Sequence, residues 1–273
     1  MTTSDVTRRR VRTRPVSGRL TSHRFGTRGQ PAESRAAILK AAVAEFAEHG
    51  IAGARTDAIA RSAHVNKALL YYYFKDKDAL YEAVLDHVFS GLRERVMPVL
   101  ESKLPPREKM LQYLGTYFDY IAANPRFPRV VQGEWVRSGN GAARMQRIAK
   151  EYFFPIFEKL GGVLREGIEA GEFRAVNPMD FLPSIAAVIV FYFTAAPLMK
   201  TLMKIDPLST ERIRERRAFV LDFISAALFV KAGSSPKRGA RGEKLKNFYD
   251  RARRNTGKST NSRPPTFSIG HGD

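Results

Sequence analysis

The sequence predicts an all-α protein of about nine helices. Apolar residues recur at helical spacing from Ile38 onward, as in Ala42 and Phe46, which follow it at intervals of four residues. Proline, glycine and asparagine interrupt this spacing at short intervals, and no run alternates apolar and polar residues between hairpin turns. The hydrophobic content of 44% and the aromatic content of 11% are those of a globular protein. We therefore expect a helical body without a β-sheet.

Proline, glycine and asparagine residues separate the predicted helices from one another. They lie near residues 38–50, 56–62, 66–74, 77–92, 106–124, 127–136, 142–170, 178–199 and 209–230. Gly50 is expected to end the first helix in a left-handed conformation, after which Ile51 folds back on the last turn. Thr56 and Asn66 are expected to cap the second and third helices.

Positive charge is concentrated at the two ends of the chain. The net charge is +19, of which residues 1–31 and residues 232–273 carry +7 each. Tails of this kind bind polyanions without sequence preference, although solvated, disordered ends have the same composition. Residues 1–31 hold no apolar segment of the kind a signal peptide needs, and the lack of cysteine fits a reducing cytosol. We expect a basic disordered arm, a basic tail and a cytoplasmic protein.

The strongest functional pattern lies between Thr56 and Phe74. Two short helices are joined by only three residues, Ala63 to Val65, a link that requires the sharp turn of a helix-turn-helix. The residues expected to pack inward against the first helix are Ile59, Ala60, Val65, Leu70 and Phe74. The residues left on the outer face are Lys67, Ala68, Tyr71 and Lys75.

This outer face has the chemistry to recognise a DNA major groove. Lys67 can donate hydrogen bonds to guanine O6 and N7, and Ala68 can contact a thymine methyl group. Hydroxyl and ammonium groups further along the helix can bind phosphates and fix the register. An aromatic core stripe is the alternative explanation of the run from Tyr71 to Phe74, but four consecutive helical residues point in different directions. The predicted DNA-binding residues are Thr56, Lys67, Ala68, Tyr71, Tyr73 and Lys77.

Several motifs occur in a fixed order between Ile38 and Leu85. They are Phe46-Ala47-Glu48-His49-Gly50, Thr56, Ile59-Ala60, Leu70-Tyr71-Tyr72-Tyr73-Phe74 and Lys77-Asp78-Ala79-Leu80. This stretch resembles the N-terminal domain of TetR-family transcriptional regulators. The chain departs from the family pattern at His64, where glycine is usual, and at Asn66, Ala68, Leu69 and Tyr73, where serine, glycine, threonine and histidine are usual. The operator sequence is therefore not transferable from a relative.

The resemblance implies how the rest of the chain is organised. Residues 32–78 would form the helix-turn-helix domain, and residues 79–231 a helical domain that binds an effector and dimerises. The expected protein is a homodimeric, ligand-responsive regulator that binds double-stranded DNA. It is expected to bind a near-palindromic operator and to repress transcription. Aromatic residues of the second domain can line a pocket for an unknown small apolar effector, which Glu134 would orient, although each is equally explained as ordinary core. The pocket candidates are Phe118, Phe127, Glu134, Trp135, Phe153, Phe157 and Phe191.

The stretch from Phe181 to Met199 has 19 residues without a charge, close to the length of a membrane span. Pro183 and Pro197 interrupt it, and we expect a helix buried in a dimer interface and no membrane partner. No cofactor, metal or catalytic residue is expected, because the five histidines lack metal-ligand spacing and no phosphate loop or nucleophile elbow occurs. Two other functions remain open: an architectural DNA protein that binds through its tails, and a small-molecule binder with a vestigial DNA-binding head.

Overall fold

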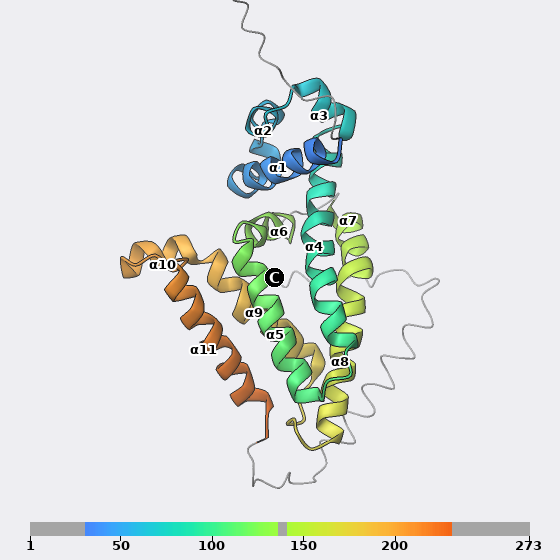
Figure 1. The fold of residues 1–273 in the computed structure, drawn as a ribbon, viewed down its shortest axis with the longest axis vertical. Coiled ribbons are helices and arrows are strands. Elements are labelled where there is room, and N and C mark those ends of the chain that lie inside the picture. Colours follow the sequence, from blue (N-terminus) through green and yellow to red (C-terminus); the bar gives the residue numbers. More distant parts are fainter. Residues whose placement is uncertain (1–30, 136–140, 231–273) are drawn as a thin grey trace, which may run out of the picture.

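The computed structural model describes residues 31–135 and 141–230, which are helical apart from turns and one isolated bridge (Figure 1). The elements, in chain order, are α1 (Pro31–Gly53), α2 (Thr56–Ser62), α3 (Lys67–Tyr73), α4 (Lys77–Glu101), α5 (Pro106–Ala123), α6 (Phe127–Trp135), α7 (Gly141–Ile148), the π-helical turn η1 (Ala149–Phe153), α8 (Phe154–Glu169), α9 (Pro178–Thr194), α10 (Ala196–Met203) and α11 (Thr210–Leu228). The all-α prediction is confirmed. The arm expected over residues 1–31 and the tail expected over residues 232–273 lie outside the described residues, apart from Pro31, which is the first residue of α1.

The described residues contain more elements than the nine helices predicted, because two predicted helices are subdivided. The segment predicted as one helix near 142–170 comprises α7, η1 and α8, which follow one another without a break. The segment predicted near 178–199 comprises α9 and α10, which meet at a bend of 58°. Pro197 lies in the first turn of α10, and proline cannot donate the backbone hydrogen bond that would continue α9 through this point.

Helices α1 to α3 form a compact head at one end of the molecule (Figure 1). Gly50 has a φ of 62°, and Ile51 is buried, so the chain turns there as predicted. Asn66 caps α3 by accepting a hydrogen bond from the Leu69 amide at 2.7 Å. The prediction that Thr56 caps α2 was wrong: Arg55 holds the cap position without a side-chain cap, and Thr56 is the first helical residue.

Helix α4 runs from the head into the body, where α5 packs beside it (Figure 1). Asp76 caps α4 through the Ala79 amide at 2.7 Å. The first turns of α4 contribute Leu80, Tyr81 and Val84 to the core, and α5 also contacts α8, α9 and α11. Because one unbroken helix serves both parts, the position of the head is set by the packing of the body around α4.

Within the described part of the chain, no single helix is both long enough and apolar enough to cross a membrane. Helices α9 and α10 have the length and apolar composition of a membrane span only when they are taken together, and the chain bends between them.

The turn between α2 and α3 generates a testable prediction. His64 has a φ of 55°, a left-handed conformation that costs a residue with a Cβ atom roughly 1–2 kcal/mol. Replacing His64 by glycine relieves this strain, and the added entropy of the unfolded chain offsets part of the gain. His64→Gly should therefore raise the free energy of unfolding in urea by about 0.5–1 kcal/mol.

His64→Ala is the matched control, because it also removes the imidazole but keeps the Cβ atom. The control should not be stabilised. A stabilising effect of alanine equal to that of glycine would show that the side chain, and not the backbone conformation, is responsible.

Candidate nucleic-acid interface

The solvent-facing side of α3 forms the candidate interface. Lys67 and Ala68 are exposed in its first turn, and Tyr71 follows one turn later with 39% of its surface exposed. The opposite side of α3 is anchored in the head by Leu70, which is fully buried, and by Phe74 just beyond the helix. The first turn of the helix is thus held outward, as base recognition in a major groove requires.

Two contacts join this face to the start of α2. The hydroxyl groups of Thr56 and Tyr71 lie 3.1 Å apart and share a hydrogen bond. The Lys67 ammonium forms an ion pair with the Asp57 carboxylate at 2.9 Å and lies 6.0 Å from the centre of the Tyr71 ring. These contacts restrict the side chains of Lys67 and Tyr71 before any DNA is bound.

The ion pair also shifts the protonation of both groups. The hydrogen bond between them lowers the pKa of the Asp57 carboxyl below its ordinary value and raises the pKa of the Lys67 ammonium. Both groups are therefore charged at neutral pH. Asp57 places a negative charge beside the predicted DNA-binding lysine, so Lys67 has to exchange a carboxylate for DNA when it binds.

Tyr73 and Lys77 lie in settings different from the other predicted DNA-binding residues. Tyr73 is half-buried and packs its ring against Tyr72 and Phe74 at centroid distances of 5.3 and 6.5 Å. The Lys77 ammonium donates to the backbone oxygens of Ala52 and Ala54, each at 3.3 Å. Lys77 therefore ties the start of α4 to the turn between α1 and α2, and Thr56, Lys67, Ala68 and Tyr71 remain gathered on one side.

Tyr72 was not among the predicted DNA-binding residues, yet it is 80% exposed. It follows Ala68 by four residues, so the two share a helix face. The spacing from Ala68 predicts an exposed Tyr72, but an outer face defined by the repeat of positions 67, 71 and 75 leaves Tyr72 out. The structure therefore adds the Tyr72 ring and hydroxyl to the exposed surface of α3.

The predicted effector-pocket residues lie in several places in the body. Phe118 is fully buried against Phe193, and Phe127 packs on Tyr120. Among the aromatic contacts of the described residues, one joins two pocket candidates: Phe153 and Phe157, at 6.3 Å. Phe191 is 70% exposed on α9, so it does not line the interior of the body. The side chain of Trp135 lies outside the described residues.

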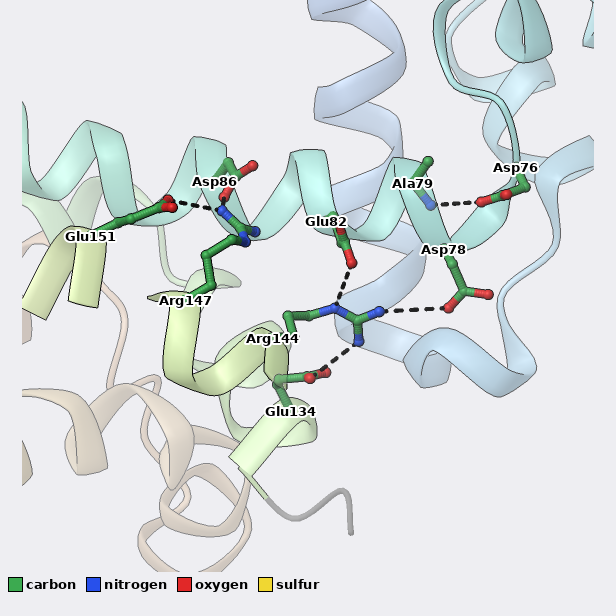
Figure 2. A network of polar contacts seen from close by, with 9 residues as sticks. All are labelled: Asp76, Asp78, Ala79, Glu82, Asp86, Glu134, Arg144, Arg147 and Glu151. Atoms are coloured by element: carbon green, nitrogen blue, oxygen red, sulfur yellow. Dashed lines mark hydrogen bonds and ion pairs between the residues drawn. The ribbon is translucent and has the colours of Figure 1, made fainter. Parts of the chain in front are cut away.

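Glu134 belongs to a polar network that fixes α6 and α7 against α4 (Figure 2). The Arg144 guanidinium of α7 lies 3.2 Å from Glu134 and 3.2 Å from Glu82, with Asp78 at 3.9 Å. Burial lowers the pKa of Arg144, but its hydrogen bonds to Glu82 and Glu134 outweigh burial and leave the pKa above its ordinary value. Glu134 is thus engaged by an arginine of its own chain.

Arg147 extends the same network one turn further along α7 (Figure 2). Its guanidinium binds Asp86 of α4 at 2.8 Å and Glu151 of η1 at 3.0 Å. The Tyr152 hydroxyl donates to the same Asp86 carboxylate at 3.1 Å. The first half of α4 is therefore held to α6, α7 and η1 by charge-assisted hydrogen bonds.

A helix-turn-helix head on a helical body defines a DNA-binding regulator, and comparisons with known proteins identify its family. Residues 38–84 match the family model of bacterial regulatory proteins of the tetR family, and residues 106–224 match the model of the tetracyclin repressor-like C-terminal domain. The transcriptional repressor SCO4008 of Streptomyces coelicolor is 31% identical over 174 residues, which are 63% of this chain and 84% of that protein. The chain belongs to the TetR family of transcriptional regulators, which is not a family of enzymes.

Other relatives are similar to this chain in sequence or in fold over most of its described residues. The transcriptional repressor NicS of Pseudomonas putida is 25% identical over 207 residues, covering 74% of this chain and 95% of that protein. The crystal structure of the transcriptional regulator SCO4942 from Streptomyces coelicolor aligns with a TM-score of 0.53 at 28% identity, covering 71% of this chain and 98% of that one. The ketosteroid transcriptional regulator KstR2 of Mycobacterium tuberculosis shares the fold, with a TM-score of 0.59 at 18% identity over 76% of this chain and 98% of that one.

The ion pair on the candidate interface predicts that Asp57 weakens DNA binding. Asp57→Asn removes the negative charge and frees Lys67, so affinity for duplex DNA should rise about threefold or more. The dependence of log affinity on log salt should also steepen by about one unit, because the variant adds one net positive charge to the face that binds DNA. Gel-shift titrations over a range of salt concentrations measure both effects.

Glu48→Gln is the matched control, since it removes one exposed carboxylate from α1 without freeing Lys67. It should change the affinity less than Asp57→Asn does. Equal affinity of Asp57→Asn and the unaltered protein would contradict the role given to the ion pair.

Proposed function

We propose that the protein is a homodimeric, ligand-responsive repressor that binds a near-palindromic operator and is released by a small apolar effector. The observation that carries the DNA-binding part is the outward face of α3, where the Asn66 cap, the Thr56–Tyr71 hydrogen bond and buried Leu70 hold Lys67 at the start of the helix. We place this repressor in the cytoplasm, where the operator is accessible.

In this proposal each chemical group of α3 has a distinct role. Lys67 donates to guanine O6 and N7, and Ala68 contacts a thymine methyl group. Tyr71 binds a backbone phosphate and fixes the register. Two recognition helices of a dimer enter successive major grooves about one helical turn apart, and for this reason the operator is near-palindromic.

Exposed aromatic residues on α9 and α11 support a dimer. Phe191 of α9 and Phe219 and Phe223 of α11 are each at least half exposed, and the two phenylalanines of α11 stack at 5.8 Å. Helices α9 and α11 pack against each other, so these side chains belong to neighbouring helices. An apolar surface of this kind is stabilised by burial against a second copy across a two-fold axis.

Release by an effector requires that the ligand bind two arrangements of the dimer with different affinity. An effector in the body acts on the packing around α4, the helix that carries the head. It favours an arrangement in which the two heads no longer match the spacing of the half-sites. Repression is the proposed direction because NicS and SCO4008 are named repressors, as is the relative KstR2 of Mycolicibacterium smegmatis.

A gel-shift and footprinting experiment tests the operator proposal. The unaltered protein should bind the promoter region that flanks its own gene and protect two half-sites. The double variant Lys67→Ala/Tyr71→Ala should lose half-site protection, with an affinity loss of roughly 100-fold, because a base contact and a phosphate contact are removed together.

Lys103→Ala is the control for the loss of a positive charge, since Lys103 is exposed beyond the body end of α4. Its affinity and footprint should match those of the unaltered protein. Unchanged sequence-specific binding by the double variant would refute the proposed recognition face.

The dimer proposal is tested by placing a charge on the exposed apolar surface. Phe223→Arg introduces two equivalent cations into a two-fold interface, so the dimer should dissociate at micromolar concentration. Light scattering coupled to size-exclusion chromatography measures the mass of the particle. Phe154→Arg is the control, because Phe154 is similarly exposed but lies on α8; a dimer that survives Phe223→Arg and dissociates with Phe154→Arg would move the interface to α8.

A further inference from the structure

Three tyrosines lie along one face of α5 in the centre of the body. Tyr113, Tyr117 and Tyr120 follow one another at intervals of four and three residues, which places them on the same side of the helix. All three side chains are buried. The Tyr120 hydroxyl donates to the backbone oxygen of Val88 at 2.7 Å, so this face of α5 is directed at α4.

The other two tyrosines differ from Tyr120 in their hydrogen bonding. Tyr113 and Tyr117 are only 6% and 7% exposed, and their rings are tilted against each other at 6.0 Å. Over residues 31–135 and 141–230, neither hydroxyl has a hydrogen-bond partner, although the Tyr120 hydroxyl on the same face has one. Neither hydroxyl oxygen is among the fully buried atoms of the described residues that lack a partner, so both keep some accessible surface at which a hydrogen-bond acceptor can bind.

The same two hydroxyls are neutral donors. Burial raises the pKa of Tyr113 well above its ordinary value and also raises the pKa of Tyr117. Arg95 and Glu94 influence the pKa of Tyr120, whereas the pKa values of Tyr113 and Tyr117 respond only to burial and, for Tyr113, to the neighbouring Tyr117. Both hydroxyls therefore stay protonated at neutral pH.

The surroundings of the pair are apolar. Helix α5 itself contributes buried Met110 and Leu114 near the pair, and α8, which packs on both α4 and α5, carries the buried side chains of Ile156 and Leu160. A ligand group with a formal charge would lose its hydration here. Buried Lys109 lies one turn before Tyr113 on the same helix face, but it is not among the groups that shift the pKa of either hydroxyl. A neutral acceptor, by contrast, accepts two hydrogen bonds and leaves no charge without a partner.

We propose that Tyr113 and Tyr117 form the polar end of the effector site and together donate hydrogen bonds to an uncharged carbonyl or ether oxygen of an otherwise apolar ligand. This inference rests on the proposed function, since it assigns the contacts of the effector that the body binds. In the absence of that ligand the two hydroxyls have no partner among the described residues, and a ligand whose oxygen pairs with both is selected over one that lacks such an oxygen.

The first test measures the stability of the free protein. Tyr113→Phe and Tyr117→Phe each remove a hydroxyl that has no partner among the described residues while keeping the ring, so neither should lower Tm. Tyr120→Phe is the matched control from the same helix face, and it should lower Tm because it breaks the bond to Val88. A lower Tm for Tyr113→Phe and Tyr117→Phe would show that bound water or another group already pairs the two hydroxyls, and would overturn the proposal.

The second test measures ligand selectivity with the full-length protein and three probes of equal chain length: 2-decanone, n-decane and decanoate. Thermal-shift titration should show that 2-decanone stabilises the unaltered protein and binds more tightly than n-decane or decanoate. The variant Tyr113→Phe/Tyr117→Phe should bind 2-decanone about tenfold more weakly, and Tyr120→Phe should bind it normally. Equal affinity of the double variant, no stabilisation by 2-decanone, or tighter binding of decanoate would each overturn the proposal.

A gel shift with promoter DNA separates this inference from the proposed function. The double tyrosine variant should bind DNA as the unaltered protein does in the absence of ligand, and only its response to 2-decanone should be lost. Failure of the unaltered protein to bind the promoter region would refute the proposed function, whatever the ketone does.

Discussion

Tyr81 joins the DNA-binding head to the body, and the arrangement of the two depends on it. Its ring packs edge-on against Phe46 of α1 at 5.0 Å, and its hydroxyl donates to the backbone oxygen of Val130 in α6 at 3.2 Å. Tyr81 lies near the start of α4, a helix of 25 residues that continues into the body. A displacement of the body helices that moves this end of α4 must therefore move the head with it.

The charges around Arg144 reinforce this junction. Glu134 is buried, and the Arg144 guanidinium forms an ion pair with it at 3.2 Å. The same guanidinium reaches Glu82 and Asp78 in the first turns of α4, so α6 and α7 cannot shift along α4 without separating paired charges. Tyr113 and Tyr117 lie on the helix that packs against the next part of α4. A ligand held by these hydroxyls thus acts on the same helix that the ionic network holds in place.

The sequence predicted the fold well because helical spacing and caps are local properties. Asn66 caps α3 and α4 begins at Lys77, both as expected, and His64 adopts the left-handed conformation that its turn requires. Thr56 was wrongly assigned as a cap because residue type alone does not distinguish the cap position from the first helical residue. The pairing of Lys67 with Asp57 and the unpaired hydroxyls of Tyr113 and Tyr117 depend on contacts between helices, which spacing along the chain does not reveal.

If α3 binds in the major groove at two half-sites, guanine N7 atoms in each half-site lie against the protein. Methylation interference on the promoter fragment tests this, because dimethyl sulfate modifies guanine N7 in the major groove and adenine N3 in the minor groove. N7 methylation should block binding in two clusters about 10 base pairs apart. Binding that is insensitive to guanine N7 methylation throughout the fragment would contradict it.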